Sequence, residues 1–256
     1  MTKINIPLTV PASAKKTYER NWRSATKGTG RLFLFAGDQK VEHLNGDFFG
    51  PNLARECNNP EHLFQIAAKA EIGVFASQLG LIARYGRDYK KVPYLVKINA
   101  KTNLMPDEGG LLSGTWTSVA DVVRFKKQSG LNIVGIGYTV YLGSAREAEI
   151  LTAASQAIIE AHQNGLLAVL WIYPRGPKVK NPEDIHLLAG AAGVAACLGA
   201  DFAKLTYPYG GGEITAKAYQ EVTEAAGRTG VICVGGSKIS PKALLEDMER
   251  QIKIAG

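Results

Sequence analysis

One lysine lies where a charged side chain is unusual. The run GADFAKLTYPYG, residues 199–210, places Lys204 in an apolar, strand-like stretch with no carboxylate next to it. Burial disfavours an ammonium ion, so an amine held there would have a lowered pKa and could attack a carbonyl carbon as a Schiff-base nucleophile. Alternatively, Lys204 lies near a strand end and extends its amine to water, as lysines commonly do.

Two further chemical groups are expected beside Lys204. Side chains alternate in direction along a strand, so Trp171 and Tyr173 share one face, and Asp38 falls at the end of the first apolar run. An amine, a phenol and a carboxylate around one opening suit carbonyl chemistry, in which an iminium withdraws electrons while the other groups transfer protons. Taken alone, Tyr173 would also fit a packed aromatic residue and Asp38 a helix or loop cap.

Several nearby residues could bind hydroxyls or an anion. Glu42 and His43 follow Asp38 in one loop and could orient substrate hydroxyls or a phosphate, or could be a solvated pair. Arg175 has the planar geometry that phosphates prefer, although it could equally pair with a carboxylate. A glycine-rich turn after the last strand offers backbone amides and a cation for a phosphate, or is a plain turn: Gly235, Gly236, Ser237 and Lys238.

Lys97, in the run LVKIN, is a second candidate Schiff-base lysine because it also lies near the carboxyl end of an apolar strand. Its sequence neighbours include no aromatic group comparable to Phe202, Tyr207 and Tyr209 around Lys204. We therefore rank Lys97 second, and its charge could instead support a bound phosphate or Lys204.

The elements that must position these residues follow a regular rhythm. Short apolar runs alternate with amphipathic ones at a spacing of roughly 30 residues, which is typical of βαβ units and a parallel sheet. The predicted strands are 31–38, 73–76 with a continuation near Leu79, 93–99, 132–137, 167–173, 201–206 and 230–234. The predicted helices are 60–71, 118–129, 145–164, 184–198, 215–227 and 241–254.

This pattern predicts an α/β fold of the (β/α)8 TIM-barrel class. No Gly-x-Gly-x-x-Gly follows the first strand, so an open Rossmann sheet fits less well. Only seven βα units are recognisable, and we expect the eighth to be missing from this chain. We assign residues 31–256 to the barrel, and residues 1–30 to an extension packed on the barrel or on a neighbouring subunit. The glycine-rich loop 99–118 is either a lid or a surface excursion.

Composition narrows the class of protein. The chain has 256 residues and a net charge of +7, but its lysines are scattered and it has no nucleic-acid-binding motif, so we predict neither a nucleic-acid nor a membrane partner. The amino terminus lacks a secretory signal, which favours a cytoplasmic protein. Cys57, Cys197 and Cys233 lack metal-site spacing and are expected to be free thiols, the last two buried.

Five segments together resemble the archaeal-type class I fructose-bisphosphate aldolases, a group that includes aminodideoxyheptulosonate synthases. They are GDQKVEH at 37–43, VKIN at 96–99, LWIYPR at 170–175, ADFAK at 200–204 and GGSK at 235–238. The resemblance covers most of the barrel. It departs from many relatives at Gln39 and Lys40, where they have His-Gly, and it lacks the last glycine-rich phosphate loop.

The resemblance implies a lyase that cleaves fructose 1,6-bisphosphate reversibly, with no metal or other cofactor. Lys204 would form the imine with a ketose phosphate, Tyr173 would transfer protons, Asp38 would position hydroxyls and Trp171 would wall the pocket. His43 and Arg175 would lie near the distal phosphate, and Gly235, Gly236 and Lys238 near the one beside the ketone. Subunits of such enzymes commonly form rings, so we expect a homo-oligomer.

Other functions remain open at this point. Another sugar-phosphate aldolase or a heptulosonate-type transaldolase could use the same residues, because only the loop contacts would differ. A barrel that binds phosphometabolites without catalysis is a further alternative.

Overall fold

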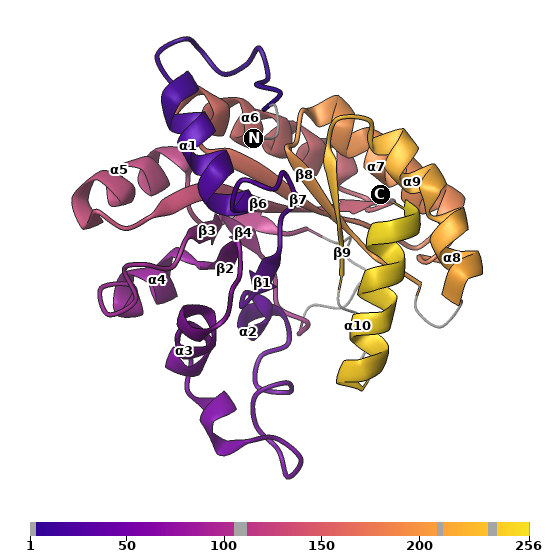
Figure 1. The fold of residues 1–256 in the computed structure, drawn as a ribbon, viewed down its shortest axis with the longest axis horizontal. Helices are drawn as coiled ribbons and strands as arrows, with labels where there is room; N and C mark the ends of the chain where they lie inside the picture. Colours follow the sequence, from indigo (N-terminus) through magenta and orange to yellow (C-terminus); the bar gives the residue numbers. More distant parts are fainter. Residues whose placement is uncertain (1–3, 105–111, 209–211, 235–239, 256) are drawn as a thin grey trace.

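The described residues of the computed structural model, 4–104, 112–208, 212–234 and 240–255, form one curved parallel sheet surrounded by helices (Figure 1). The sheet has seven strands in the order β1-β2-β3-β6-β7-β8-β9 and forms a nearly closed barrel of the TIM type, as predicted. Its strands are β1 (Leu34–Ala36), β2 (Val74–Gln78), β3 (Tyr94–Lys97), β6 (Ile133–Leu142), β7 (Leu167–Pro174), β8 (Phe202–Leu205) and β9 (Gly230–Cys233).

Helices connect successive strands on the outside of this sheet (Figure 1). Their ends are marked by local sequence signals: Ser118 and Asp121 form a capping box at the start of α5, and Gly199 ends α7 in the left-handed conformation (φ 85°). The helices are α1 (Lys15–Thr26), α2 (Gln39–Glu42), α3 (Glu61–Lys69), α4 (Leu79–Tyr85), α5 (Val119–Ser129), α6 (Glu147–Gln163), α7 (Ile185–Leu198), α8 (Gly212–Ala218), α9 (Gln220–Ala226) and α10 (Pro241–Arg250), with a 3-10 turn at Arg55–Asn58 and a π turn at Gln251–Ala255.

The sheet separates two apolar cores because strand side chains alternate in direction. Leu170 and Ile172 of β7 point outward and pack in the core that the sheet shares with the surrounding helices. Val169 and Trp171 of the same strand belong to a second core inside the barrel. The inner face is apolar along most of its length, so the polar residues near the carboxyl ends of the strands stand out.

Helix α1 packs against the amino-terminal end of the inner core. Tyr18 is fully buried and donates a hydrogen bond of 2.5 Å to Asp201, which directly precedes β8. The other oxygen of Asp201 binds the side chain of His162 at 3.1 Å and accepts from the backbone N–H of Ala168 at 2.8 Å. The Trp22 ring stacks on Phe202 with 5.1 Å between centroids. This cluster joins the amino-terminal segment to strands β7 and β8.

All seven predicted strands are present, but two boundaries are wrong in ways that matter. The expected continuation of the second strand near Leu79 is the helix α4, which starts directly after Gln78. The strand predicted to end at residue 137 continues to Leu142, because the segment after Gly137 is also apolar and stays paired with β7. The helix predicted at 215–227 is divided into α8 and α9.

The long loop after β3 is partly described. The base of this loop, 99–118, is a short antiparallel pair of β4 (Asn99–Ala100) and β5 (Gly114–Thr115). Residues 105–111 of the loop lie outside the described residues, so the choice between a lid and a surface excursion stays open. The three cysteines are free thiols, as predicted. The predicted burial of Cys197 is wrong, because this residue is exposed on α7. Cys233 is half-buried. Across the described ranges, no helix is both long and apolar enough to cross a membrane.

Candidate active site

Strands β3, β6, β7 and β8 bring polar side chains together near their carboxyl ends. Trp171 of β7 is paired in register with Thr139 of β6 on one side and with Lys204 of β8 on the other. Lys97 of β3 pairs with Gly137, two residues before Thr139. These residues therefore occupy one level of the barrel interior, at the end where barrel enzymes carry their active sites.

Lys204 is buried, with 8% of its surface exposed. Its Nζ lies 5.1 Å from the centroid of the Trp171 ring and makes no hydrogen bond or ion pair with another described residue. Burial lowers its pKa, and the charges of Asp38 and Glu42 oppose this effect. The expected Tyr207 contribution to its pocket is wrong: Tyr207 points outward and packs on Tyr219, since it is three residues from Lys204 along the chain.

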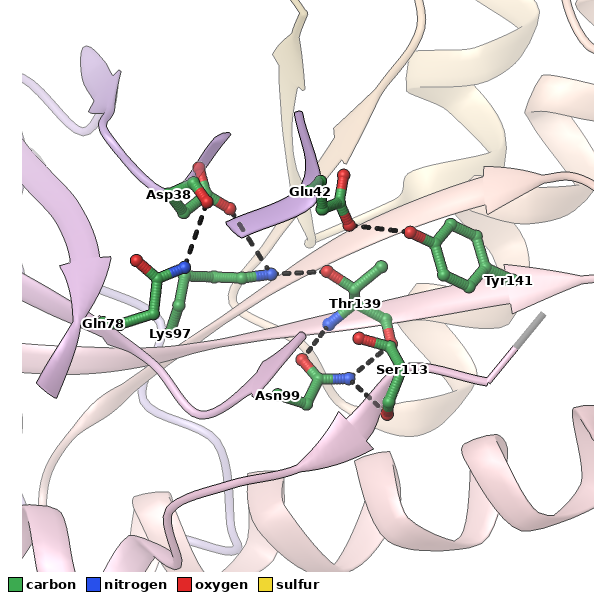
Figure 2. A network of polar contacts seen from close by, with 8 residues as sticks. All are labelled: Asp38, Glu42, Gln78, Lys97, Asn99, Ser113, Thr139 and Tyr141. Atoms are coloured by element: carbon green, nitrogen blue, oxygen red, sulfur yellow. Dashed lines mark hydrogen bonds and ion pairs between the residues drawn. The ribbon is translucent and has the colours of Figure 1, made fainter. Parts of the chain in front are cut away.

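Lys97 is equally buried but is held by partners. Its Nζ lies 3.6 Å from Oδ2 of Asp38 and donates a hydrogen bond to Thr139 (Figure 2). The same Nζ lies 4.3 Å from the centroid of the Trp171 ring. Lys97 therefore has an aromatic neighbour, contrary to the prediction, because Trp171 comes from a strand distant in the sequence. Burial lowers the pKa of Lys97, Asp38 and Glu42 raise it, and Lys204 lowers it further.

A glycine makes this close packing of two lysines on one tryptophan possible. A Cβ atom at Gly137 would lie 2.6 Å from the Trp171 ring and 2.7 Å from Cδ of Lys97. Neither side chain could keep its place beside a larger residue. Gly137 therefore shapes the site by the absence of a side chain.

Asp38 does not act as a helix cap, although it precedes α2. Its side chain makes no capping hydrogen bond; it is 13% exposed and faces Lys97. Its backbone carbonyl accepts a hydrogen bond of 3.0 Å from the side-chain amide of Gln78, which pairs with Lys97 in the sheet (Figure 2). The backbone of Asp38 is thus fixed, and its carboxylate lies beside the amine of Lys97.

Asn99 and Thr139 are site residues that the sequence reading missed. The Asn99 side chain accepts from the Thr139 N–H at 2.7 Å and donates to the Thr139 carbonyl at 2.9 Å and the Ser113 carbonyl at 3.2 Å (Figure 2). It thereby fixes the strand that carries Thr139 and ties it to the base of the β4–β5 loop. Asn99 lies in the segment VKIN that carries the family resemblance, and the sequence signal for Thr139 was the length of the apolar run after Gly137.

A second layer of groups lies closer to the open end. Tyr173 pairs in register with Tyr141, their rings are 6.5 Å apart, and Arg175 stacks 5.1 Å from the Tyr173 centroid. Burial raises the pKa of Tyr173, and Asp38 and Glu42 raise it further while Arg175 lowers it. The Tyr173 hydroxyl binds no other described residue. Within the described residues, Tyr173 is therefore not a packed tyrosine whose hydroxyl is held by a structural partner.

The remaining predicted residues are not gathered into this cluster. The His43 side chain is exposed and binds the neighbouring Asp47. Gly235, Gly236, Ser237 and Lys238 lie outside the described residues. Across the described part of the chain, no three His, Cys, Asp or Glu side chains gather as metal ligands would.

The arrangement combines an uncommitted amine of lowered pKa, a second cation beside a carboxylate, and a phenol without a described partner. An unprotonated amine can add to a carbonyl carbon, while a neighbouring acid and base exchange protons with the adduct. These are the components of Schiff-base catalysis.

Comparison with known proteins agrees with this chemistry. The sequence profile of the DeoC/LacD family of aldolases matches residues 32–256. The chain is 53% identical over 253 residues to a Methanocaldococcus jannaschii protein named fructose-bisphosphate aldolase/6-deoxy-5-ketofructose 1-phosphate synthase, covering 99% of this chain and 81% of the relative. It is 31% identical over 225 residues to a class 1 fructose-bisphosphate aldolase of Halobacterium salinarum, covering 87% and 79%.

Two solved structures are also similar. A fructose-bisphosphate aldolase from Slackia heliotrinireducens superposes with a TM-score of 0.95 at 47% identity, covering 99% of this chain and 80% of that one. An archaeal fructose-1,6-bisphosphate aldolase, whose catalytic lysine is covalently bound to the carbinolamine intermediate of its substrate, superposes with a TM-score of 0.78 at 27% identity, covering 92% and 87%. The chain therefore belongs to the DeoC/LacD family of aldolases, and it is a lyase.

Proposed function

We propose that this aldolase cleaves fructose 1,6-bisphosphate reversibly to dihydroxyacetone phosphate and glyceraldehyde 3-phosphate, through an iminium on Lys204. The unprotonated Lys204 amine adds to the C2 carbonyl, and loss of water from the carbinolamine gives the iminium. The C4 hydroxyl then loses a proton as the C3–C4 bond breaks. The electron pair of that bond passes into the iminium to form an enamine, and C4 becomes the aldehyde carbon of glyceraldehyde 3-phosphate. Protonation of the enamine at C3 and addition of water release dihydroxyacetone phosphate and restore the amine.

The observation that carries this proposal is the difference between the two lysines. Lys204 and Lys97 are both buried beside Trp171, but only Lys97 has an ion pair and a hydrogen bond that stabilise its ammonium form. Lys204 is free to lose its proton and attack. A similar protein whose catalytic lysine is bound covalently to its substrate supports the same chemistry.

The other side chains take roles that follow from their positions. Tyr173, in the layer above Lys204, transfers protons to and from the C4 hydroxyl and C3, while Asp38 orients hydroxyls beside Lys97. Trp171 forms the wall of the pocket. Arg175 binds the distal phosphate from the open end, together with His43 after it leaves Asp47. The phosphate beside the ketone is assigned to Gly235, Gly236, Ser237 and Lys238, with support from the charge of Lys97.

One alternative substrate is favoured by a specific observation. The relative at 53% identity is also named 6-deoxy-5-ketofructose 1-phosphate synthase. Breaking the C3–C4 bond of that product gives dihydroxyacetone phosphate and a three-carbon 2-oxoaldehyde, so the same lysine could serve both reactions. A heptulosonate-type transaldolase would again use Lys204, and a non-catalytic barrel would bind the phosphates without forming an imine.

Three broader expectations belong to the same proposal. A fructose-bisphosphate aldolase would act in glycolysis and gluconeogenesis, in the cytoplasm, and the resemblance to ring-forming enzymes implies a homo-oligomer. No metal or organic cofactor is required by the steps above, since the iminium itself stabilises the electron pair.

The decisive experiment is covalent trapping. Borohydride added with dihydroxyacetone phosphate should reduce the imine, and peptide mass spectrometry should locate the adduct on Lys204. Lys204→Met should abolish both trapping and cleavage of fructose 1,6-bisphosphate, whereas Lys97→Met should still trap on Lys204. Normal trapping in Lys204→Met would exclude the proposal, and binding of the sugar phosphate by wild type without trapping or cleavage would favour the non-catalytic barrel.

A further inference from the structure

A glutamate and a tyrosine form a pair at the upper layer of the site. Tyr141 is 1% exposed, and its hydroxyl donates a hydrogen bond of 2.8 Å to Oε1 of the half-buried Glu42 (Figure 2). The Glu42 backbone carbonyl accepts a further bond of 3.0 Å from the N–H of Asn103. The carboxylate of Glu42 is therefore held through both its side chain and its backbone.

The position of this pair is defined by the register of the sheet. Tyr141 is two residues beyond Thr139 on β6, which places it about 6–7 Å closer to the open end than the layer of Lys97 and Lys204. It pairs with Tyr173, the proposed proton donor at the bond that is broken. The charge of Glu42 also raises the pKa values of Lys97 and Lys204, so it lies close enough to influence both amines.

The chemistry of the pair is one-sided. A carboxylate only accepts hydrogen bonds, and the single hydrogen of the Tyr141 hydroxyl is already directed at Glu42. The second oxygen of Glu42 has no hydrogen-bond partner among the described residues. That oxygen is suited to a hydroxyl group, whereas a ketone oxygen in the same place would face another acceptor without a proton between them.

We propose that Glu42, held by Tyr141, selects sugar phosphates with a hydroxyl rather than a ketone on the carbon next to the aldehyde carbon of the cleaved half. This inference rests on the proposed function, because it presumes that Lys204 forms the imine. It makes Glu42 a specificity-determining residue and Tyr141 a positioning residue. It also assigns the chain to polyhydroxylated substrates in preference to 5-keto sugars.

The test uses two aldehydes that differ only at this carbon. With dihydroxyacetone phosphate as the donor, kcat/KM is measured for 2-hydroxypropanal, each enantiomer separately, and for 2-oxopropanal. Wild type should have a higher kcat/KM for its better 2-hydroxypropanal enantiomer than for 2-oxopropanal. Glu42→Gln and Glu42→Ala should reduce this preference about 10- to 100-fold, the range of a hydrogen bond to a charged group, mainly by losing activity towards the hydroxyaldehyde. Tyr141→Phe should reduce it less, since the carboxylate remains but is no longer fixed.

Borohydride trapping of dihydroxyacetone phosphate in the same variants separates the two proposals. At a pH above the acidic limb of trapping, Glu42→Gln should trap on Lys204 as wild type does, because the donor lacks the aldehyde half. The limb itself should move to lower pH, since the Glu42 charge raises the pKa of Lys204. Normal trapping with an unchanged preference, or a wild-type preference for 2-oxopropanal, would overturn the role of Glu42 and leave the imine intact. Loss of trapping in Glu42→Gln as complete as in Lys204→Met would overturn it too, since Glu42 would then act in imine formation. Absence of trapping in wild type would overturn the proposed function itself.

Glu56→Gln, an exposed change in the turn Arg55–Asn58, is the charge-matched control.

Discussion

Two lysines of equal burial differ here because of what surrounds their amines. Burial lowers the pKa of both, and Asp38 and Glu42 raise both, but only Lys97 has direct contacts with Asp38 and Thr139. An ion pair and a hydrogen bond therefore distinguish Lys97 from Lys204, although both are buried. The proposed division of roles follows from this difference.

The same electrostatics predict the pH dependence of the Asp38→Asn variant. The Asp38 charge raises the pKa of Lys204, so its removal should lower that pKa, with Glu42 and Lys97 still facing the amine. The unprotonated amine is then reached at lower pH, and the acidic limb of the pH profile of trapping should move to lower pH. The rate of borohydride trapping with dihydroxyacetone phosphate, measured across pH, checks this.

Asp47→Asn is the matched control, because Asp47 is exposed and binds His43 instead of either lysine. Its acidic limb should coincide with that of wild type. A limb that stays in place or moves to higher pH in Asp38→Asn would contradict the assigned coupling.

At the scale of elements, β6 contributes more to the site than any single motif. It presents Gly137, Thr139 and Tyr141 on its inner face, the first two beside the lysines and Trp171 and the third nearer the open end. These three side chains, a glycine, a hydroxyl and a phenol, share no chemistry, so they do not form a recognisable sequence motif. They belong together because one strand carries them past both Lys97 and Trp171.

Gly137→Ala should impair catalysis without unfolding the protein. The added Cβ would displace Trp171 or Lys97, and a misplacement on the order of 1 Å can cost about 10²-fold in rate. We expect kcat/KM for fructose 1,6-bisphosphate to fall by about that factor, while the circular dichroism spectrum stays that of wild type.

Gly190→Ala provides a control for the same substitution. Apart from its chain neighbours and the nearby backbone of α7, no atom lies within 4 Å of a Cβ built at Gly190, so activity should be retained and stability unchanged or slightly increased. Wild-type kinetics in Gly137→Ala would show that the tight packing of tryptophan and lysine is dispensable.

For the whole molecule, the two ends of the barrel carry separate functions. The carboxyl ends of the strands hold the candidate site, and the amino-terminal end is covered by α1 through Tyr18, Asp201 and His162. The inner core between them is continuous and apolar. Changes at the covered end should therefore alter stability and leave the chemistry unaffected.

Tyr18→Phe tests this separation. It removes the donor to the buried Asp201 and should lower the free energy of unfolding by about 1–3 kcal/mol, the cost of leaving a buried acceptor without its partner. Urea unfolding followed by circular dichroism measures the loss, and kcat should remain that of wild type. Tyr85→Phe, whose hydroxyl binds no other described residue, should change stability much less. Equal stability of Tyr18→Phe and wild type would mean that α1 is not held by this contact.

The sequence determined the barrel class, all seven strands and the residues that reach the site from single strands. Lys204, Tyr173 and Asp38 were predicted because strand alternation is a local property: it assigns each side chain to a face without knowledge of the neighbouring strand. Glu42 could also be singled out, but only as one of two possibilities. The division into residues 1–30 and 31–256, and the roles of the site residues, stay predictions.

The tertiary structure decided which side chains from distant segments contact one another. Trp171 contacts both lysines, Asn99 binds Thr139, and Tyr141 binds Glu42, and each of these pairs joins segments at least 33 residues apart in the sequence. Such contacts depend on the register between strands and on the space left by Gly137. Register is set by packing across the whole barrel and not by any one segment, and for this reason the sequence could name Lys204 as a candidate nucleophile but not the contacts that distinguish it from Lys97.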